Sequence, residues 1–307
     1  MPVDSIQTDV SLEVFPVNTS MLQEPVLDMA LLTLLGIAQD GGRPQPGCTR
    51  PCCEGLTEAD YRSPVSLSIQ TSNGKTLLIE ATRDLGRQLR MVGNPSVDHL
   101  FITHAHLGHV DGLGLFGRET MSARHIQLHC SPSMQDLVEA TPAWNQLLKQ
   151  NVLTFSEFPT VTIDDVTIEF IQVPHRAELS DMHATILRGE NQSVLFLPDH
   201  DSWGETLQAH SCDTIRQFLT KYEIDIALLD GTFWSGGELQ GRDMSVVPHP
   251  TVEESLRRLG TRKDSDPEIY FIHLNHTNPL YNSTSDEYDQ LKKSGWALGV
   301  ECQQFTI

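Results

Sequence analysis

Three histidines stand close together in the segment FITHAHLGHVDGLG: His104, His106 and His109. They follow the apolar run FIT, which is typical of a strand, and precede a run that is typical of a helix. Side chains at positions 104 and 106 would project to one side, with His109 curling back toward them. Converging imidazoles suit a divalent transition metal, zinc by default, with iron or manganese as alternatives. This spacing after an apolar strand favours a metal site over a polar surface loop.

The six cysteines include a second group that could bind metal. Cys48, Cys52 and Cys53 lie within the segment GCTRPCC. In a reducing compartment such crowding indicates a metal site more than a disulfide framework. The other three cysteines stand alone, and we expect each to be a buried apolar thiol: Cys130, Cys212 and Cys302.

Two series of short apolar runs, bounded by turn residues, predict the strands that must position these side chains. The first series comprises residues 31–38, 65–70, 76–81, 99–104 and 125–130, and the second comprises residues 153–158, 166–174, 184–189, 193–199, 226–232 and 269–274. The clearest helical stretches are residues 112–121, 133–140, 214–222, 251–260 and 285–295. Strands in two sets with interspersed helices indicate a layered α/β protein. We expect residues 29–307 to form a single domain and residues 1–28 to be a poorly structured extension.

Composition limits the partners of this chain. Its formal net charge of -20 repels polyanions, and no Lys/Arg cluster supplies a basic channel, so we expect a small-molecule substrate and no nucleic acid. No apolar run reaches the roughly 20 residues of a membrane helix, so we expect no membrane partner. The N-terminal segment lacks the basic region and apolar core of a secretory signal, which favours a cytoplasmic protein. The oligomeric state stays open, and a homodimer is compatible with the sequence.

The histidine segment resembles HxHxDH, the motif that follows a strand in the metallo-β-lactamase superfamily. The likeness extends from about residue 31 to the end of the chain. Within that superfamily the chain most resembles the PhnP-type cyclic phosphodiesterases of phosphonate breakdown and the PqqB-type proteins of pyrroloquinoline quinone biosynthesis. The segment GIAQDGGRPQPGC is similar to the opening of both branches. The resemblance implies a four-layer αββα sandwich of two similar halves.

The resemblance implies further metal ligands at the ends of strands. His175 follows VTIEFIQVP, as the third-motif histidine does in the family, and His183 is the alternative ligand or a pocket residue. Asp199 follows SVLFLP, where the family places a carboxylate able to bridge two metals, whereas we expect His200 to face outward. His273 follows IYFI and resembles the fifth-motif histidine. The implied ligand set is His104, His106, His109, His175, Asp199 and His273.

One position departs from the family motif, because Gly108 stands where HxHxDH has its aspartate. In the two-metal members that aspartate binds the second metal, which glycine cannot do. The second site is therefore weakened, or it recruits another oxygen. Asp111 is the nearest candidate, although a carboxylate there would equally stabilise the N-terminus of a helix. We therefore expect one or two ions at the catalytic centre.

A second zinc site is also implied by the resemblance. In the PhnP-type branch, a histidine three residues after the fifth-motif histidine joins N-terminal cysteines at a structural zinc. Cys48, Cys52, Cys53 and His276 would accordingly form a closed Cys3His site. The adjacency of Cys52 and Cys53 departs from the usual spacing and leaves open whether both bind one ion. A catalytic role for His276 is the alternative.

Two more segments are similar to parts of the family's active site. Asp230 and His249 lie in segments similar to those that line its mouth in the phosphodiesterase branch. His249 is the candidate for protonating a leaving group or binding a substrate oxyanion, and a surface histidine near a helix is the alternative. Glu80 stands where the family has a structural aspartate after a strand. We expect it to hold the histidine loop by hydrogen bonds.

These observations predict a metal-dependent hydrolase that acts on a small ester or phosphodiester-type substrate through a metal-activated water. The first alternative is a PqqB-like oxygenase or biosynthetic protein, since histidines alone do not distinguish zinc from redox-active iron. The second is a non-catalytic binding module that zinc stabilises.

Overall fold

The computed structural model describes residues 28–176, 178–239 and 247–307, so the predicted extension lies outside it except for Asp28. The first half of the chain forms most of a seven-stranded sheet in the order β14-β1-β2-β3-β4-β5-β6. Its strands are β1 (Leu31–Gly36), β2 (Ser66–Gln70), β3 (Thr76–Ile79), β4 (His99–Phe101), β5 (Ile126–His129), β6 (Leu153–Phe155) and β14 (Gln304–Thr306). Strands β14 to β3 are antiparallel, and β3 to β6 are parallel.

The second sheet repeats this plan in the order β13-β12-β11-β10-β9-β8-β7. Its strands are β7 (Thr160–Ile163), β8 (Val166–Gln172), β9 (His183–Arg188), β10 (Ser193–Leu197), β11 (Ile226–Asp230), β12 (Glu268–Ile272) and β13 (Ala297–Leu298). Along the chain it also passes from antiparallel strands, β7 to β10, to parallel ones, β10 to β13. The two halves are therefore similar, as predicted.

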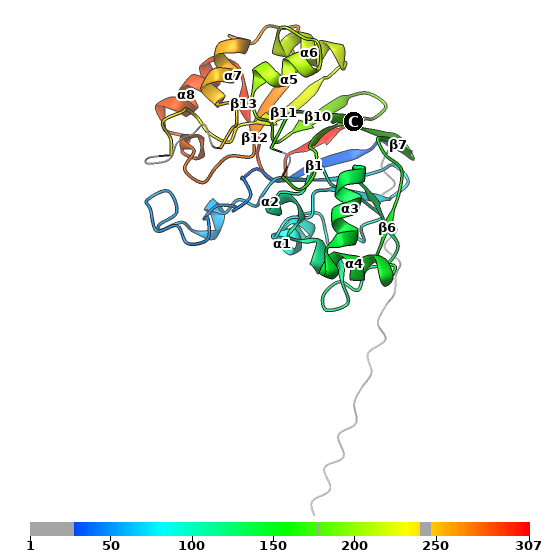
Figure 1. Cartoon of the computed structure of the whole chain (residues 1–307). Coiled ribbons are helices and arrows are strands. Elements are labelled where there is room, and N and C mark those ends of the chain that lie inside the picture. Colours follow the sequence, from blue (N-terminus) through cyan, green and yellow to red (C-terminus); the bar gives the residue numbers. More distant parts are fainter. Residues whose placement is uncertain (1–27, 177, 240–246) are drawn as a thin grey trace, which may run out of the picture.

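Helices cover the outer face of each sheet (Figure 1). The first sheet carries α1 (Leu85–Met91), α2 (Leu107–Val110), α3 (Pro132–Ala140) and α4 (Pro142–Lys149), with the 3-10 turns η1 (Glu58–Asp60) and η2 (Leu113–Phe116) in its half. The second carries α5 (Trp203–Ala209), α6 (Ile215–Lys221), α7 (Val252–Leu259), η4 (Pro279–Tyr281) and α8 (Asp286–Lys293). The predicted four-layer αββα sandwich is confirmed.

Side chains alternate between the two faces of each strand, so one sheet packs against an apolar layer on either side. In β10, Val194 and Phe196 enter the core between the sheets, whereas Leu195 and Leu197 pack under helices. Successive side chains of a strand point to opposite faces, and here both faces are covered. Central strands are consequently apolar throughout, and polar groups collect where the strands end.

Some predicted elements were wrong. The helix expected over residues 112–121 is absent, and this stretch contains only the 3-10 turn η2. The Gly112 amide donates to the Ala81 carbonyl at 2.8 Å instead of continuing α2. A Cβ at Gly112 would lie 2.1 Å from the Thr82 carbonyl oxygen, so only glycine allows this approach. Cys130 is buried as predicted, but Cys212 is half-buried and Cys302 is exposed in the turn before β14.

Within the described part of the chain, no helix has the length and apolar character needed to cross a membrane.

Candidate metal centre

The predicted ligands meet at one edge of the sandwich, because each follows the carboxyl end of a strand. His104 and His106 follow β4, and His109 lies in the short helix α2. His175 follows β8, and Asp199 lies just beyond β10. The remaining member, placed directly after β12, is His273.

A first group consists of His104, His106 and His175, with ligand nitrogens within 4.8 Å of one another. The His175 Nε2 lies 3.2 Å from the His106 Nδ1. Burial lowers the pKa of His104 well below its usual value and also lowers the pKa of His175. A neutral imidazole is the form that binds metal, so the surroundings favour the ligand form of both residues.

A second group consists of Asp40, His109 and His273. The Asp40 Oδ1 lies 3.5 Å from the His109 Nε2 and 3.6 Å from the His273 Nε2. Asp40 was not among the predicted site residues, although it lies in the segment GIAQDGG that carried the family resemblance. The sequence did contain one signal: Gly108 cannot supply the carboxylate of the HxHxDH motif, so another acidic residue could take that place in the centre.

Asp199 lies between the two groups. Its Oδ2 is 3.1 Å from the His109 Nε2 and 3.4 Å from the His273 Nε2, and its Oδ1 is 3.9 Å from the His175 Nε2. Burial alone would raise the pKa of Asp199, but His273 and His109 hold it well below its usual range. The ionised carboxylate can therefore face both groups of ligands.

Several atoms in this centre are buried and lack a hydrogen-bond partner. They include the Nε2 atoms of His104 and His273 and the Oδ2 of Asp199. Buried polar atoms without partners are costly, and a cation bound among them would remove that cost. The residues present therefore fit a divalent metal ion.

The Thr103 hydroxyl fixes the tautomer of His104. It donates its only proton to the Glu80 carboxylate and lies 2.9 Å from the His104 Nδ1. It can therefore only accept from that nitrogen, which leaves the His104 Nε2 lone pair facing the centre. Glu80 also lies 3.2 Å from the His109 Nδ1 and adopts a positive φ of 68° directly after β3. Its contacts are those of a residue that holds the histidine loop.

In the second half of the chain, a threonine hydroxyl and a carboxylate orient His273 in the same way. The Thr232 hydroxyl donates to the Asp230 Oδ1 at 2.7 Å and lies 2.8 Å from the His273 Nδ1. It therefore accepts from that nitrogen, and the His273 Nε2 is left as a free ligand atom. Like Glu80, His273 has a positive φ, here 60°, directly after a strand. Side chains next to a metal ligand commonly orient it in this way.

His249 lies beside the centre and is held by Asp230. Its Nδ1 lies 2.8 Å from the Asp230 Oδ2, and one of its nitrogens is within 4.8 Å of ligand atoms of Asp199 and His273. Burial would lower the pKa of His249, but Asp230 raises it above the usual value. The side chain is buried, so the alternative of a surface histidine is wrong.

Three residues lie away from both groups. Asp111 pairs with Arg83 at 2.7 Å and is absent from every ligand cluster of the described residues. His183 lies 3.8 Å from Asp181 and packs against phenylalanine rings. The prediction that His200 faces outward is wrong: it is fully buried and its Nδ1 lies 2.8 Å from the Thr206 hydroxyl of α5.

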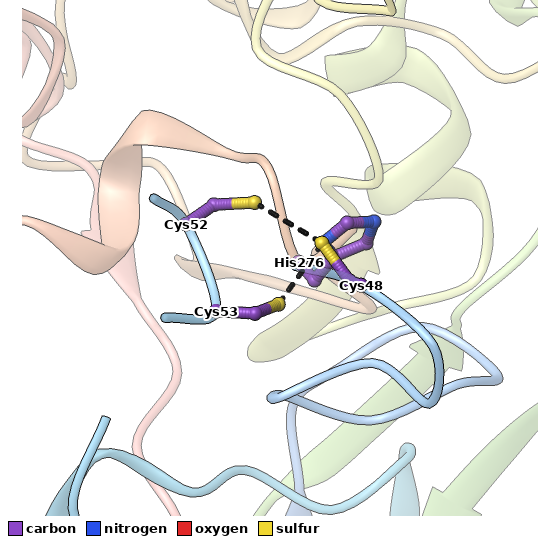
Figure 2. A group of neighbouring side chains, drawn as sticks. All are labelled: Cys48, Cys52, Cys53 and His276. Carbon is purple, nitrogen blue, oxygen red and sulfur yellow. Dashed lines mark hydrogen bonds between the residues drawn. The ribbon is translucent and has the colours of Figure 1, made fainter. Parts of the chain in front are cut away.

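The cysteines and His276 converge as a separate group (Figure 2). The Cys48 and Cys52 sulfurs are 3.8 Å apart, and the Cys52 and Cys53 sulfurs lie 3.4 and 3.3 Å from the His276 Nδ1. In a tetrahedral zinc site two sulfurs stand about 3.8 Å apart, and sulfur and nitrogen about 3.6 Å. Although Cys52 and Cys53 are adjacent in the sequence, both sulfurs thus belong to one group of potential ligands.

Electrostatics at this cysteine group also favour a cation. Hydrogen bonds from Arg50 outweigh burial and lower the pKa of Cys48 to about 7. Burial and the neighbouring Cys48 raise the pKa of Cys52 to about 11. Burial lowers the pKa of His276. Three cysteine sulfurs so close together could all ionise only beside a positive partner, which a zinc ion would supply.

A cavity of about 550 Å³ opens between the two candidate metal sites. Its lining includes Asp40 and His276 and also Arg50 and Arg83. In a chain with a formal net charge of -20, two guanidinium groups thus line this cavity, and that of Arg83 is paired with Asp111.

Comparison with known proteins agrees with this geometry. The family model for the beta-lactamase superfamily domain matches residues 75–274, and the chain belongs to this family. Coenzyme PQQ synthesis protein B of Acinetobacter baumannii (strain ACICU) is 25% identical over 312 residues, which cover 89% of this chain and 99% of that protein. The protein of the same name from Xanthomonas oryzae pv. oryzae (strain MAFF 311018) is 24% identical, covering 87% and 96%.

Two solved structures share the fold. Zn(2+)-bound PqqB from Methylobacterium extorquens superimposes with a TM-score of 0.66 at 17% identity, covering 90% of this chain and 100% of that one. A diphosphatase from the PhnP family superimposes with a TM-score of 0.63 at 20% identity, covering 91% and 97%. The predicted likeness to both branches is therefore confirmed at the level of fold and family.

Proposed function

We propose that this chain is a metal-dependent hydrolase of a small ester or phosphodiester-type substrate. The observation that carries the proposal is the arrangement of two ligand groups around the shared carboxylate of Asp199. Imidazole and carboxylate donors suit zinc, which we propose for both the centre and the Cys3His group, with iron or manganese as alternatives at the centre. A divalent ion bound there would lower the pKa of a coordinated water from about 15.7 toward about 7.

The protein's own groups would supply the remaining requirements. The outer partners Glu80 and Asp230 keep the histidine nitrogens oriented toward the centre. His249, whose pKa is raised by Asp230, would donate a proton to the leaving group. Arg83 at the cavity wall is available to bind an anionic part of the substrate.

The test of this proposal combines metal content with a substrate screen. Protein purified from metal-limited cells would be reconstituted with zinc and assayed against bis-p-nitrophenyl phosphate, cyclic nucleotides, lactams and thioesters. We expect hydrolysis of at least one ester or phosphodiester, lost on chelation and restored by zinc. Iron binding with oxygen uptake and no hydrolysis would reject the hydrolase.

That last result would favour a second candidate, a metal-dependent biosynthetic protein of pyrroloquinoline quinone synthesis. Relatives named Coenzyme PQQ synthesis protein B, which this chain matches over nearly their whole length, support this candidate. The carboxylates that orient the histidines would do so for bound iron as well as for bound zinc. The ligand geometry therefore supports both candidates.

We expect His249→Gln to lower kcat about 100-fold, the lower end of what a general acid contributes. Since the protonated form is the active one and Asp230 raises its pKa, wild-type kcat should fall as pH rises through that raised pKa. The variant should lack this alkaline decline. The measurement is kcat against pH, with His183→Gln as the control for loss of a buried histidine. Unchanged kcat in His249→Gln would exclude it as the acid.

We expect Arg83→Ala to raise KM for an anionic substrate about tenfold, as loss of one charge-assisted hydrogen bond predicts. Asp111→Asn is the matched control, because it removes the Arg83 ion pair but keeps the guanidinium. It should leave KM within about twofold, since exposed ion pairs contribute little. Equal effects of the two variants would show that the ion pair, not substrate binding, is responsible.

A further inference from the structure

Asp40 and Gly108 occupy the same small volume of the centre. A Cβ built on Gly108 would lie 2.3 Å from the Asp40 Oδ1 and 2.5 Å from its Cα. Because a backbone atom is among these contacts, rotating the Asp40 side chain would not make room. A side chain at position 108 and Asp40 in its present place exclude each other.

We propose that Asp40 supplies the carboxylate ligand that Gly108 cannot provide, so that a second ion is held by Asp40, His109, His273 and Asp199. This inference rests on the proposed metal centre and specifies its second half. Asp40 thereby takes the part considered for Asp111, whose carboxylate pairs with Arg83.

Three of the four distances are longer than an ordinary N–H···O hydrogen bond and fit ligands of one ion. Oxygen and nitrogen atoms bound to the same tetrahedral zinc stand about 3.4 Å apart. The Asp40 Oδ1 lies 3.5 and 3.6 Å from the two Nε2 atoms, and the Asp199 Oδ2 lies 3.1 and 3.4 Å from the same atoms. The His273 Nε2 has no hydrogen-bond partner, and Thr232 already occupies its Nδ1. The His273 Nε2 is therefore available to bind the same ion as Asp40.

The backbone around Asp40 is fixed against the strand end that carries His273. The Gln39 amide donates to the Leu274 carbonyl at 2.9 Å, and the Leu274 amide donates to the Ile37 carbonyl at 2.8 Å. The Gly42 amide closes the turn on the Gln39 carbonyl at 2.7 Å, with Gly42 at a φ of 69°. Asp40 is thus held beside His273 by main-chain bonds, a preorganised arrangement for a ligand.

The side chain of Asp40 is 41% exposed, whereas those of His109 and His273 are buried. Asp40 also borders the cavity between the candidate metal sites. One of the residues that would hold the second ion, Asp40, is therefore accessible from this cavity.

Metal counting tests this assignment without reference to turnover. Zinc bound after dialysis at a fixed free zinc concentration would be measured for wild type, Asp40→Ala and Asp111→Asn, with circular dichroism as the check on folding. We expect three ions per wild-type chain, three for Asp111→Asn, and two for Asp40→Ala. Calorimetric titration should show the affinity for the lost ion weakened at least about 100-fold, the upper end of the effect of losing an outer-shell partner.

The outcomes separate the two proposals. Three tightly bound ions in folded Asp40→Ala would overturn the role of Asp40 while leaving a two-ion centre intact. Two ions in wild type would overturn it while leaving a one-ion centre. A wild-type chain that binds zinc only at the Cys3His group would reject the proposed function itself. Asp40→Asn, which keeps the shape but removes the charge, covers the case in which the alanine variant fails to fold.

Discussion

Asp199→Asn is expected to lower kcat/KM by at least about 1,000-fold, which corresponds to about 4 kcal/mol of transition-state stabilisation. Asp199 lies within 4.0 Å of the Nε2 atoms of His104, His109, His175 and His273. Asparagine keeps the volume but offers a neutral, weaker ligand. Both ligand groups should therefore lose affinity for metal together.

The measurement is kcat/KM together with the number of ions per chain. Asp266→Asn is the matched control, because Asp266 is a carboxylate with a largely buried side chain that pairs with Arg216 at 2.6 Å, outside the metal centre. We expect that control to reduce stability but not metal content. If Asp199→Asn kept its centre-bound ions and its turnover, Asp199 would not be the shared ligand.

Cys53→Ser is expected to remove the zinc of the Cys3His group and lower the free energy of unfolding by about 3 kcal/mol or more, since structural zinc contributes directly to folding. The Cys53 sulfur is buried and 3.3 Å from the His276 Nδ1. Without the ion, the cysteine segment would lose its link to the loop after β12. Removing zinc from the wild type with a chelator should likewise lower its melting temperature.

The measurement is thermal unfolding with zinc counting, and Cys302→Ser is the control, because that thiol is exposed and outside the cluster. His276→Ala should behave like Cys53→Ser. Loss of turnover in His276→Ala with normal melting and full zinc would instead support the catalytic alternative for His276.

The architecture was accessible from the sequence because central strands buried on both faces are uninterrupted apolar runs. Such runs marked the central strands, including β3, β10 and β11. Length did not decide which of the helices with seven or eight residues were predicted. The sequence predicted α6, α7 and α8 but not α1, α4 and α5. The short edge strands β13 and β14 had no pattern long enough to recognise.

Site residues were predictable where the signal was local or carried by the family resemblance. His104, His106 and His109 stand in one segment, and His273 follows an apolar strand. Asp40 was missed because its relation to Gly108 is a tertiary close approach that sequence spacing does not encode. His200 was misplaced because β10 is covered on both faces, so the residue after Asp199 turns toward α5 rather than solvent.

The proposed metal centre is tested most directly by the position of metal in crystals of zinc-saturated protein, located by anomalous diffraction at the zinc edge. We predict a peak shared by His104, His106, His175 and Asp199, a second beside Asp40, His109 and His273, and a third among the cysteines and His276. A peak at the cysteines with none among the histidines would contradict the proposal that these side chains bind a common metal centre.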